Sequence, residues 1–317
     1  MVQFHQPLYN ITPFQDVDKN DTSAILRAAD LNWSLVLKPC LYHDENNDLI
    51  IGSKRYLLIS RGGVLSEMTV VGRDYKCIQP INIIELFQKT DKIIPLNLIS
   101  AGHTRDGKYI YVIGEIIGVN LTPTEESLSL NKCIMMSVCN DGNGKLKVTP
   151  VMMTKTGSQL RLTQGDKATP LTYELSHHFD FDGDEVLFNI KENIIEMFDI
   201  FSNEIEFLNS IPLTSDTLDE FCHQIFKRFN IGNEKTKRNY DKTLSELKEH
   251  YKLLSVYYPK ATQGTMFSLY LFFCDYLDFS KTRKSGINGR IHSINFGHDS
   301  VSKNTAFKII YKLAKEA

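Results

Sequence analysis

The spacing of hydrophobic residues changes once along the chain. From Trp33 to about Thr172, short β-branched and aromatic runs are separated by turn signals, which is typical of strands joined in hairpins. Glycine and asparagine in those turns tolerate the positive φ that tight hairpins need. The predicted strands are Trp33–Leu37, Tyr56–Ser60, Met68–Val71, Tyr109–Val119, Lys132–Val138, Lys145–Thr154 and Ser158–Thr163.

Near Lys191 the apolar residues begin to recur at helical spacing, and Ile194, Phe198, Phe201 and Ile205 fall on one face. Thr217 and Glu220 predict a capping box before the next helix. The spacing predicts further helices over Leu244–Leu254, Phe267–Tyr276 and Ala306–Leu313, and one among the strands over Ile81–Lys89.

Strands followed by helices favour an α+β fold. We predict an N-terminal arm (residues 1–30), a mainly antiparallel β-sheet region (31–190) and a helical C-terminal half (191–317), which can form one continuous domain. The 317 residues are 42% hydrophobic, as expected of a globular protein. No apolar run is long enough to span a bilayer, no signal core is seen, and the cysteines form no CxxC pair, so we expect a cytoplasmic protein away from membranes.

Charge is strongly segregated although the net charge is only −2. Residues 174–220 hold 13 acids and one base, for −12, whereas residues 221–317 hold 17 bases and eight acids, for +9. A basic third beside an acidic belt is consistent with head-to-tail packing of subunits, or with a basic face for nucleic acid. Solvated faces of amphipathic helices would give the same pattern.

Basic and aromatic residues interleave at three predicted strand ends, which is typical of surfaces that hold single-stranded nucleic acid. One of these ends is Lys54-Arg55-Tyr56 with Arg61. The alternative is that the tyrosines point into the core while the bases reach solvent. The residues predicted to contact phosphate are Arg61, Arg73, Lys76, Arg105, Lys108, Arg283, Lys284 and Arg290, and Tyr75 and Tyr109 are predicted to stack on bases.

The sequence gives weaker evidence for a metal site or a catalytic site. His177, His178, Asp180 and Asp182 are weak candidates for a divalent metal site, since imidazoles and carboxylates stand at short spacing, but a solvated acidic strand explains them as well. There is no phosphate-binding loop and no nucleophile elbow. We therefore predict a protein that is not an enzyme and that uses no cofactor.

Several short motifs follow one another in an order that resembles a family of phage- and plasmid-borne proteins known as a domain of unknown function. The resemblance covers about residues 30–317. Its elements are Trp33, Tyr75 with Gln79, Ala101-Gly102, Asp141-Gly142, Thr149-Pro150, a histidine at 177 or 178, and a C-terminal block with Gly264, Thr265, Tyr276 and Asp278.

The chain also departs from that family pattern. The family has an arginine and a Cys-x-Asn motif after the proline, where this chain reads Val151 to Thr156. In the C-terminal block, Phe267, Leu271 and Phe279 stand in place of tryptophan, asparagine and a final histidine. A reactive site built from those polar groups would be incomplete here.

The resemblance implies a mobile-element protein without implying a reaction. With the basic and aromatic strand ends, it leads us to predict a nucleic-acid-binding protein, specifically a single-stranded DNA-binding or annealing protein of recombination that forms a homo-oligomer. The alternative is an interaction protein that binds a host or phage protein through the acidic belt (174–220), as an anti-defence factor or DNA mimic.

Overall fold

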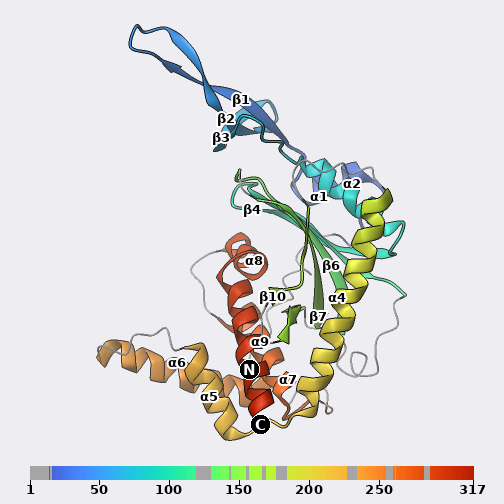
Figure 1. Ribbon diagram of the computed structural model, residues 1–317, viewed down its shortest axis with the longest axis vertical. Helices are drawn as coiled ribbons and strands as arrows, with labels where there is room; N and C mark the ends of the chain where they lie inside the picture. The colour runs from blue at the N-terminus through green and yellow to red at the C-terminus, as the bar shows by residue number, and fades with distance from the viewer. Residues whose placement is uncertain are drawn as a thin grey trace.

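The computed structural model describes residues 14, 16–118, 130–142, 144–154, 157–165, 169–175, 184–226, 234–254, 260, 262–281 and 286–317. A short helix, α1 (Thr22–Ala28), precedes a three-stranded antiparallel sheet that projects from the body of the molecule (Figure 1). This sheet consists of β1 (Ser34–His43), β2 (Leu49–Arg61) and β3 (Val64–Gly72) in that order.

A larger antiparallel sheet forms the body, in the order β11-β7-β6-β5-β4, with β8 also paired to β7. A two-stranded sheet pairs β9 with β10. The strands are β4 (Leu96–Thr104), β5 (Tyr109–Ile116), β6 (Leu130–Cys139), β7 (Leu146–Thr154), β8 (Gln159–Arg161), β9 (Thr163–Gln164), β10 (Thr169–Pro170) and β11 (Tyr173–Leu175).

Helices cover both faces of the body sheet. α2 contacts β5 and β6 on one face, where α4 also crosses β7, and α8 packs on the other face against β4 (Figure 1). α1 packs against α2, and α5, α6, α7 and α9 gather at the other end, where α7 and α9 contact β8. The helices after α1 are α2 (Pro80–Asp91), α4 (Asp184–Ser210), α5 (Ser215–Ile225), α6 (Glu234–Leu254), α7 (Met266–Asp275), the π-helix η3 (Tyr276–Ser280), α8 (Ile287–Asn295) and α9 (His298–Glu316).

Burial follows the alternation of the strands. In β5, Val112 belongs to the large core cluster that reaches α2, α4 and the C-terminal helices, whereas Tyr111 and Ile113 belong to a smaller cluster with Ile291 and Ile294 of α8. Successive residues of a strand face opposite sides of its sheet. Both faces of the sheet are therefore buried, and its strands read as almost continuous apolar runs.

The predicted α+β architecture is confirmed, with antiparallel sheets first and helices after them. The predicted capping box at Thr217 is wrong. The hydroxyl of Thr214 accepts a hydrogen bond from the Thr217 amide at 3.1 Å, so α5 starts three residues earlier and Thr217 lies inside it. Among the described residues, no helix combines the length and the apolar character needed to cross a bilayer.

Candidate nucleic-acid interface

Part of each predicted basic strand end lies where the projecting sheet joins the body, whereas Lys54, Arg55 and Tyr56 of the first lie further out on that sheet. Arg61 ends β2, and its Nη2 lies 3.3 Å from Nε2 of His103 near the end of β4. Its guanidinium also lies 5.5 Å from the centre of the Trp33 ring. The same histidine nitrogen is 3.2 Å from Oδ2 of Asp30. The turn after β2 is therefore fixed against the body, beside the turn that carries Arg105.

The β4–β5 turn is held close to the projecting sheet. Gly107 has φ +92°, and a Cβ there would lie 2.8 Å from Cδ1 of Ile59 and 2.9 Å from the Trp33 ring. Arg105, which precedes it, also has a positive φ of 50° and its side chain is exposed. The close approach of this glycine places Arg105 at the surface of the junction.

Asn140 links the segment after β3 to the end of β6. Its Oδ1 accepts hydrogen bonds from the Tyr75 hydroxyl at 3.2 Å and the Ile78 amide at 3.4 Å, and its Nδ2 donates to the Ile78 carbonyl at 3.2 Å. The backbone N–H of Asn140 donates to the backbone carbonyl of Lys108 at 2.7 Å. Lys76 is consequently held near Lys108, although 32 positions separate them in the sequence. In the sequence, Asn140 stands at the start of a turn signal, Asn140-Asp141-Gly142, and nothing local indicates this role.

Tyr109 is half-buried among other rings. Its ring centre lies 4.7 Å from that of His292 and 5.0 Å from that of Phe296, and the Arg105 guanidinium lies 5.9 Å away. Burial, with a hydrogen bond to Cys139, raises the pKa of Tyr109 to about 12. Burial likewise raises the pKa of the half-buried Tyr75. Stacking by these two tyrosines stays a prediction, and a nucleotide would have to share their rings with protein neighbours.

We expect His292 to make the stability of the protein depend on pH. Burial and the nearby Arg105 lower its pKa from 6.5 to about 4, so the folded state holds the neutral imidazole, 3.0 Å from the Thr104 hydroxyl. The unfolded state then binds more protons between these values, and the stability contributed above pH 6.5 is lost progressively as the pH falls to about 4. Urea midpoints at about pH 7 and about pH 5 measure this loss, which should be smaller in His292→Gln. An equal loss in both proteins would contradict this role.

The clearest concentration of positive charge lies on the projecting sheet itself. We call Lys38, Lys54, Arg55 and Arg73 the stem. Lys38 pairs with Tyr56 across β1 and β2, Lys54 pairs with Gly72 of β3, and Arg73 follows directly. Lys38, Lys54 and Arg73 are exposed, and Tyr56 is half-exposed between them. Strand alternation places Lys54 and Tyr56 on one face of β2 and Arg55 on the other.

Carboxylates distinguish the stem from the junction. We call Arg61, Lys76, Arg105 and Lys108 the rim. Three acids lie beside these four bases: Asp30 near Arg61, Asp106 next to Arg105, and Asp141 next to Asn140, which bonds to Lys108. The net charge of the rim is therefore four minus three, or +1. The stem has four bases and two neighbouring acids, Asp74 beside Arg73 and Glu67 opposite Leu58 in β3, for +2. The segment from Arg73 to Lys76 joins the two, and the stem has the stronger positive charge.

Other predicted site residues lie elsewhere. Arg290 is in α8 with its guanidinium 5.8 Å from the centre of the Phe279 ring, in the contact between α8 and η3. Arg283 and Lys284 lie outside the described residues, as do the candidate metal ligands His177, His178, Asp180 and Asp182. Within the described ranges, no group of three or more histidine, cysteine and acidic side chains could hold a metal.

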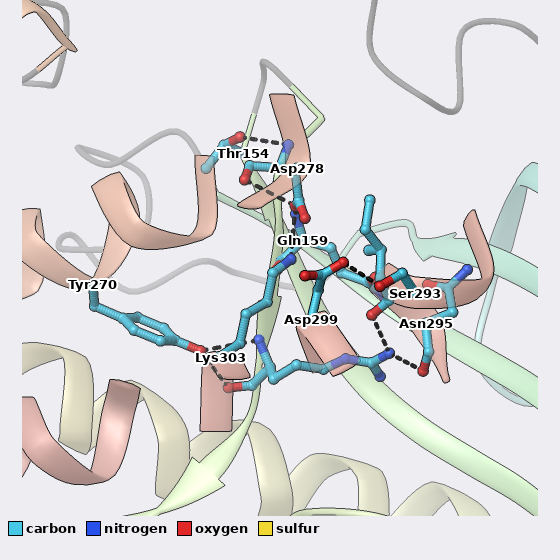
Figure 2. A network of polar contacts seen from close by, with 11 residues as sticks. Thr154, Gln159, Tyr270, Asp278, Ser293, Asn295, Asp299 and Lys303 are labelled. Carbon is cyan, nitrogen blue, oxygen red and sulfur yellow. Dashed lines mark hydrogen bonds and ion pairs between the residues drawn. The ribbon is translucent and has the colours of Figure 1, made fainter. Parts of the chain in front are cut away.

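A buried polar network fixes the C-terminal helices to the body sheet (Figure 2). Nζ of Lys303 in α9 is 2.7 Å from Oδ2 of Asp278 in η3 and donates to the Gln159 carbonyl of β8 at 2.6 Å. Asp278 also accepts from the Ser158 hydroxyl at 3.1 Å and the Gln159 amide at 3.0 Å. Lys303 and Asp278 are 0% and 1% exposed, so they cannot touch a ligand and serve to hold the fold.

Arg161 extends this network to α8. Its guanidinium donates to the carbonyls of Ile294, at 3.1 Å, and Asn295 (Figure 2). Tyr270 of α7 and the backbone of Arg161 exchange two hydrogen bonds, at 3.0 and 3.2 Å. Asp278 was singled out only through the family resemblance, whereas Lys303 and Arg161 had no signal in the sequence, because a single charged residue in an amphipathic run normally faces solvent.

An apolar pocket of about 380 Å³ lies between α4 and the ends of β4 and β5. Ile94, Ile116, Ile194 and Phe198 line it, and Lys132 lies at its wall with Nζ 5.6 Å from the centre of the Phe198 ring. Its lining is mostly aliphatic, and it does not include the stem or rim.

Comparison with protein-family models, with curated proteins and with solved structures finds no match for this chain.

Proposed function

We propose that the protein binds single-stranded nucleic acid, with single-stranded DNA as the expected ligand, along the outer face of the stem and across the rim. The observation that supports this most strongly is the register of β1 on β2, which places the exposed Lys38 and Lys54 beside the half-exposed Tyr56, with the exposed Arg73 directly after the end of β3 opposite Lys54. Ammonium and guanidinium groups neutralise phosphates, and an accessible tyrosine ring can stack on an unpaired base of any sequence.

The geometry favours a flexible single strand over a rigid duplex. The stem lies on a sheet that projects from the body, and the rim lies at the junction below it (Figure 1). A ligand that touches both has to bend between two surfaces, which an unpaired strand does readily. Strand annealing in recombination, by copies of the protein that hold two strands, is the activity we propose for this surface.

Neutralising two stem lysines tests the proposal. We expect Lys38→Gln with Lys54→Gln to weaken binding of a labelled oligonucleotide at low salt, because two phosphate contacts are removed. Fluorescence anisotropy measures the affinity. The matched control is Lys242→Gln with Lys312→Gln, which changes the net charge equally at side chains that are 75% and 64% exposed in α6 and α9. Equal weakening by both pairs would show that net charge alone matters and would contradict a site on the stem.

The second candidate function is binding of a protein partner through the acidic belt. Glu192, Glu196, Asp199 and Glu206 are exposed along α4, and none of them makes an ion pair with another described residue. Such a row of carboxylates suits a basic protein surface or imitates nucleic acid. If the protein binds no oligonucleotide at low salt, Glu192→Lys with Glu196→Lys becomes the variant to test against candidate partners.

A further inference from the structure

The outer part of the projecting sheet has no partner on its apolar face. β3 ends at Gly72, opposite Lys54, and beyond that point β1 and β2 continue as a two-stranded ribbon, residues 39–53 (Figure 1). On one face of the ribbon Leu41 pairs with Ile51. Leu49, two residues before Ile51 in the same strand, lies on the same face. These side chains are 49%, 71% and 60% exposed. Three large aliphatic residues at this exposure on a projecting ribbon indicate a docking surface.

Charge is distributed unevenly along the ribbon. Its tip carries Asp44, Glu45 and Asp48, and Oδ1 of Asp44 fixes the turn by accepting from the Asn46 and Asp48 amides at 2.9 and 2.8 Å. At the other end stands Arg55 of the stem, which strand alternation places on the same face as Ile51. Glu45, Asp48 and Arg55 make no ion pair with any described residue.

We propose that this face binds the same face of a second copy of the chain, with the two ribbons antiparallel and related by a two-fold axis near Leu41 and Ile51. At about 3.3 Å per residue, Asp48 lies roughly 10 Å from Ile51 in one direction. In the other direction the register shifts, so that Arg55 pairs with Pro39, only two residues from Leu41, and lies about 7 Å from Ile51 along the ribbon, a difference that the long side chains can span. The two-fold axis therefore brings each acidic tip onto the partner's Arg55. The same patch serves both copies, as a two-fold interface requires.

At the base of β1 the edge of the sheet is closed to the addition of a strand. The Gln79 side chain occupies the outer edge of β1 at its base, because its Oε1 accepts from the Leu35 amide at 2.8 Å and its Nε2 donates to the Leu35 carbonyl at 2.9 Å. Alternate residues of a strand direct their backbone groups to the same edge. Leu37 and then Pro39 are the next positions of β1 on that edge, and Pro39 has no backbone N–H to donate. Another strand cannot pair continuously there.

This inference uses Arg55 alone of the stem residues, and it is separate from nucleic-acid binding on the outer face, because Lys38, Lys54 and Tyr56 lie on the opposite face of the sheet from Ile51 and Arg55. Sedimentation velocity of the full chain over a concentration series, without nucleic acid, tests it. We expect a monomer–dimer equilibrium in the parent protein, and a monomer at every concentration for the tip variant Glu45→Lys with Asp48→Lys and for the stem variant Arg55→Glu.

Mixing the two variants gives the decisive result. In a mixed dimer the basic tip of one chain meets the acidic residue 55 of the other, and the acidic tip meets Arg55, so both contacts are attractive. We expect the mixture to dimerise although neither variant does so alone. A monomeric parent protein, a dimer that both variants leave unchanged, or a mixture that stays monomeric would each overturn the proposal. Glu45 and Asp48 are exposed at the tip and Arg55 is partly exposed in β2, so the variants should fold.

Discussion

Replacing Lys303 with methionine is expected to lower the free energy of unfolding by about 3–5 kcal/mol, since one partner of a buried ion pair is removed and the other stays charged. Asp278 would keep the Ser158 hydroxyl and the Gln159 amide as donors, but its Oδ1 has no hydrogen-bond partner among the described residues. The pair connects α9, η3 and β8, so its loss affects the attachment of the whole C-terminal group of helices.

Urea unfolding measures this effect, and two further variants sharpen it. Lys312→Met, on the same helix but 64% exposed, should change the free energy by only a few tenths of a kcal/mol, as is usual for surface positions. Adding Asp278→Leu to Lys303→Met should recover much of the loss, because apolar replacement of a whole buried pair is often tolerated. A loss of less than about 1 kcal/mol for Lys303→Met would contradict the structural role of the pair.

The second large effect is expected at Asn140, which is 0% exposed. Asn140→Ala leaves the amide and carbonyl of Ile78 without their side-chain partner, at a cost of about 1–3 kcal/mol for each buried group left unpaired. The Arg73–Lys76 segment would also be released from the end of β6. Chemical unfolding measures the first consequence and oligonucleotide affinity the second.

Tyr75→Phe is the matched control for Asn140→Ala. It removes the hydrogen bonds of the Tyr75 hydroxyl to Asn140 and with the Gly142 backbone and keeps both bonds to Ile78, so the expected loss is about 1–2 kcal/mol. Equal destabilisation by the two substitutions would show that Asn140 does not anchor this segment through Ile78.

The class of the fold could be predicted from the sequence because the strands are regular. The run Lys132–Val138 lies within β6, and the Arg105-Asp106-Gly107 turn joins β4 to β5 as glycine at positive φ requires. The start of α5 could not be placed, because Thr214 and Thr217 are both good caps and only the fold selects the first. α8 was missed because it is only nine residues long and contains Gly289, although Ile287, Ile291 and Ile294 stand at helical spacing.

The candidate site was predictable in part. The basic and aromatic residues of each strand end can be read from local sequence, but their meeting depends on contacts between distant segments, such as Arg61 with His103 and Tyr75 with Asn140. Of the stem, the sequence singled out Lys54, Arg55 and Arg73, whereas Lys38 joins it only through the register of β1 on β2. Burial of the Tyr109 ring against Phe296 also had no local signal.

The central claim, that the stem holds the phosphates of a single strand, is tested most directly by the salt dependence of oligonucleotide affinity. With three or four contacts, the logarithm of the association constant should fall against the logarithm of salt concentration with a slope of about −2 to −3, at −0.7 per contact. Lys38→Gln with Lys54→Gln should flatten that slope by about 1.4, and Lys242→Gln with Lys312→Gln should leave it unchanged. No binding at about 50 mM salt, or a slope that the stem variant does not alter, would contradict the account.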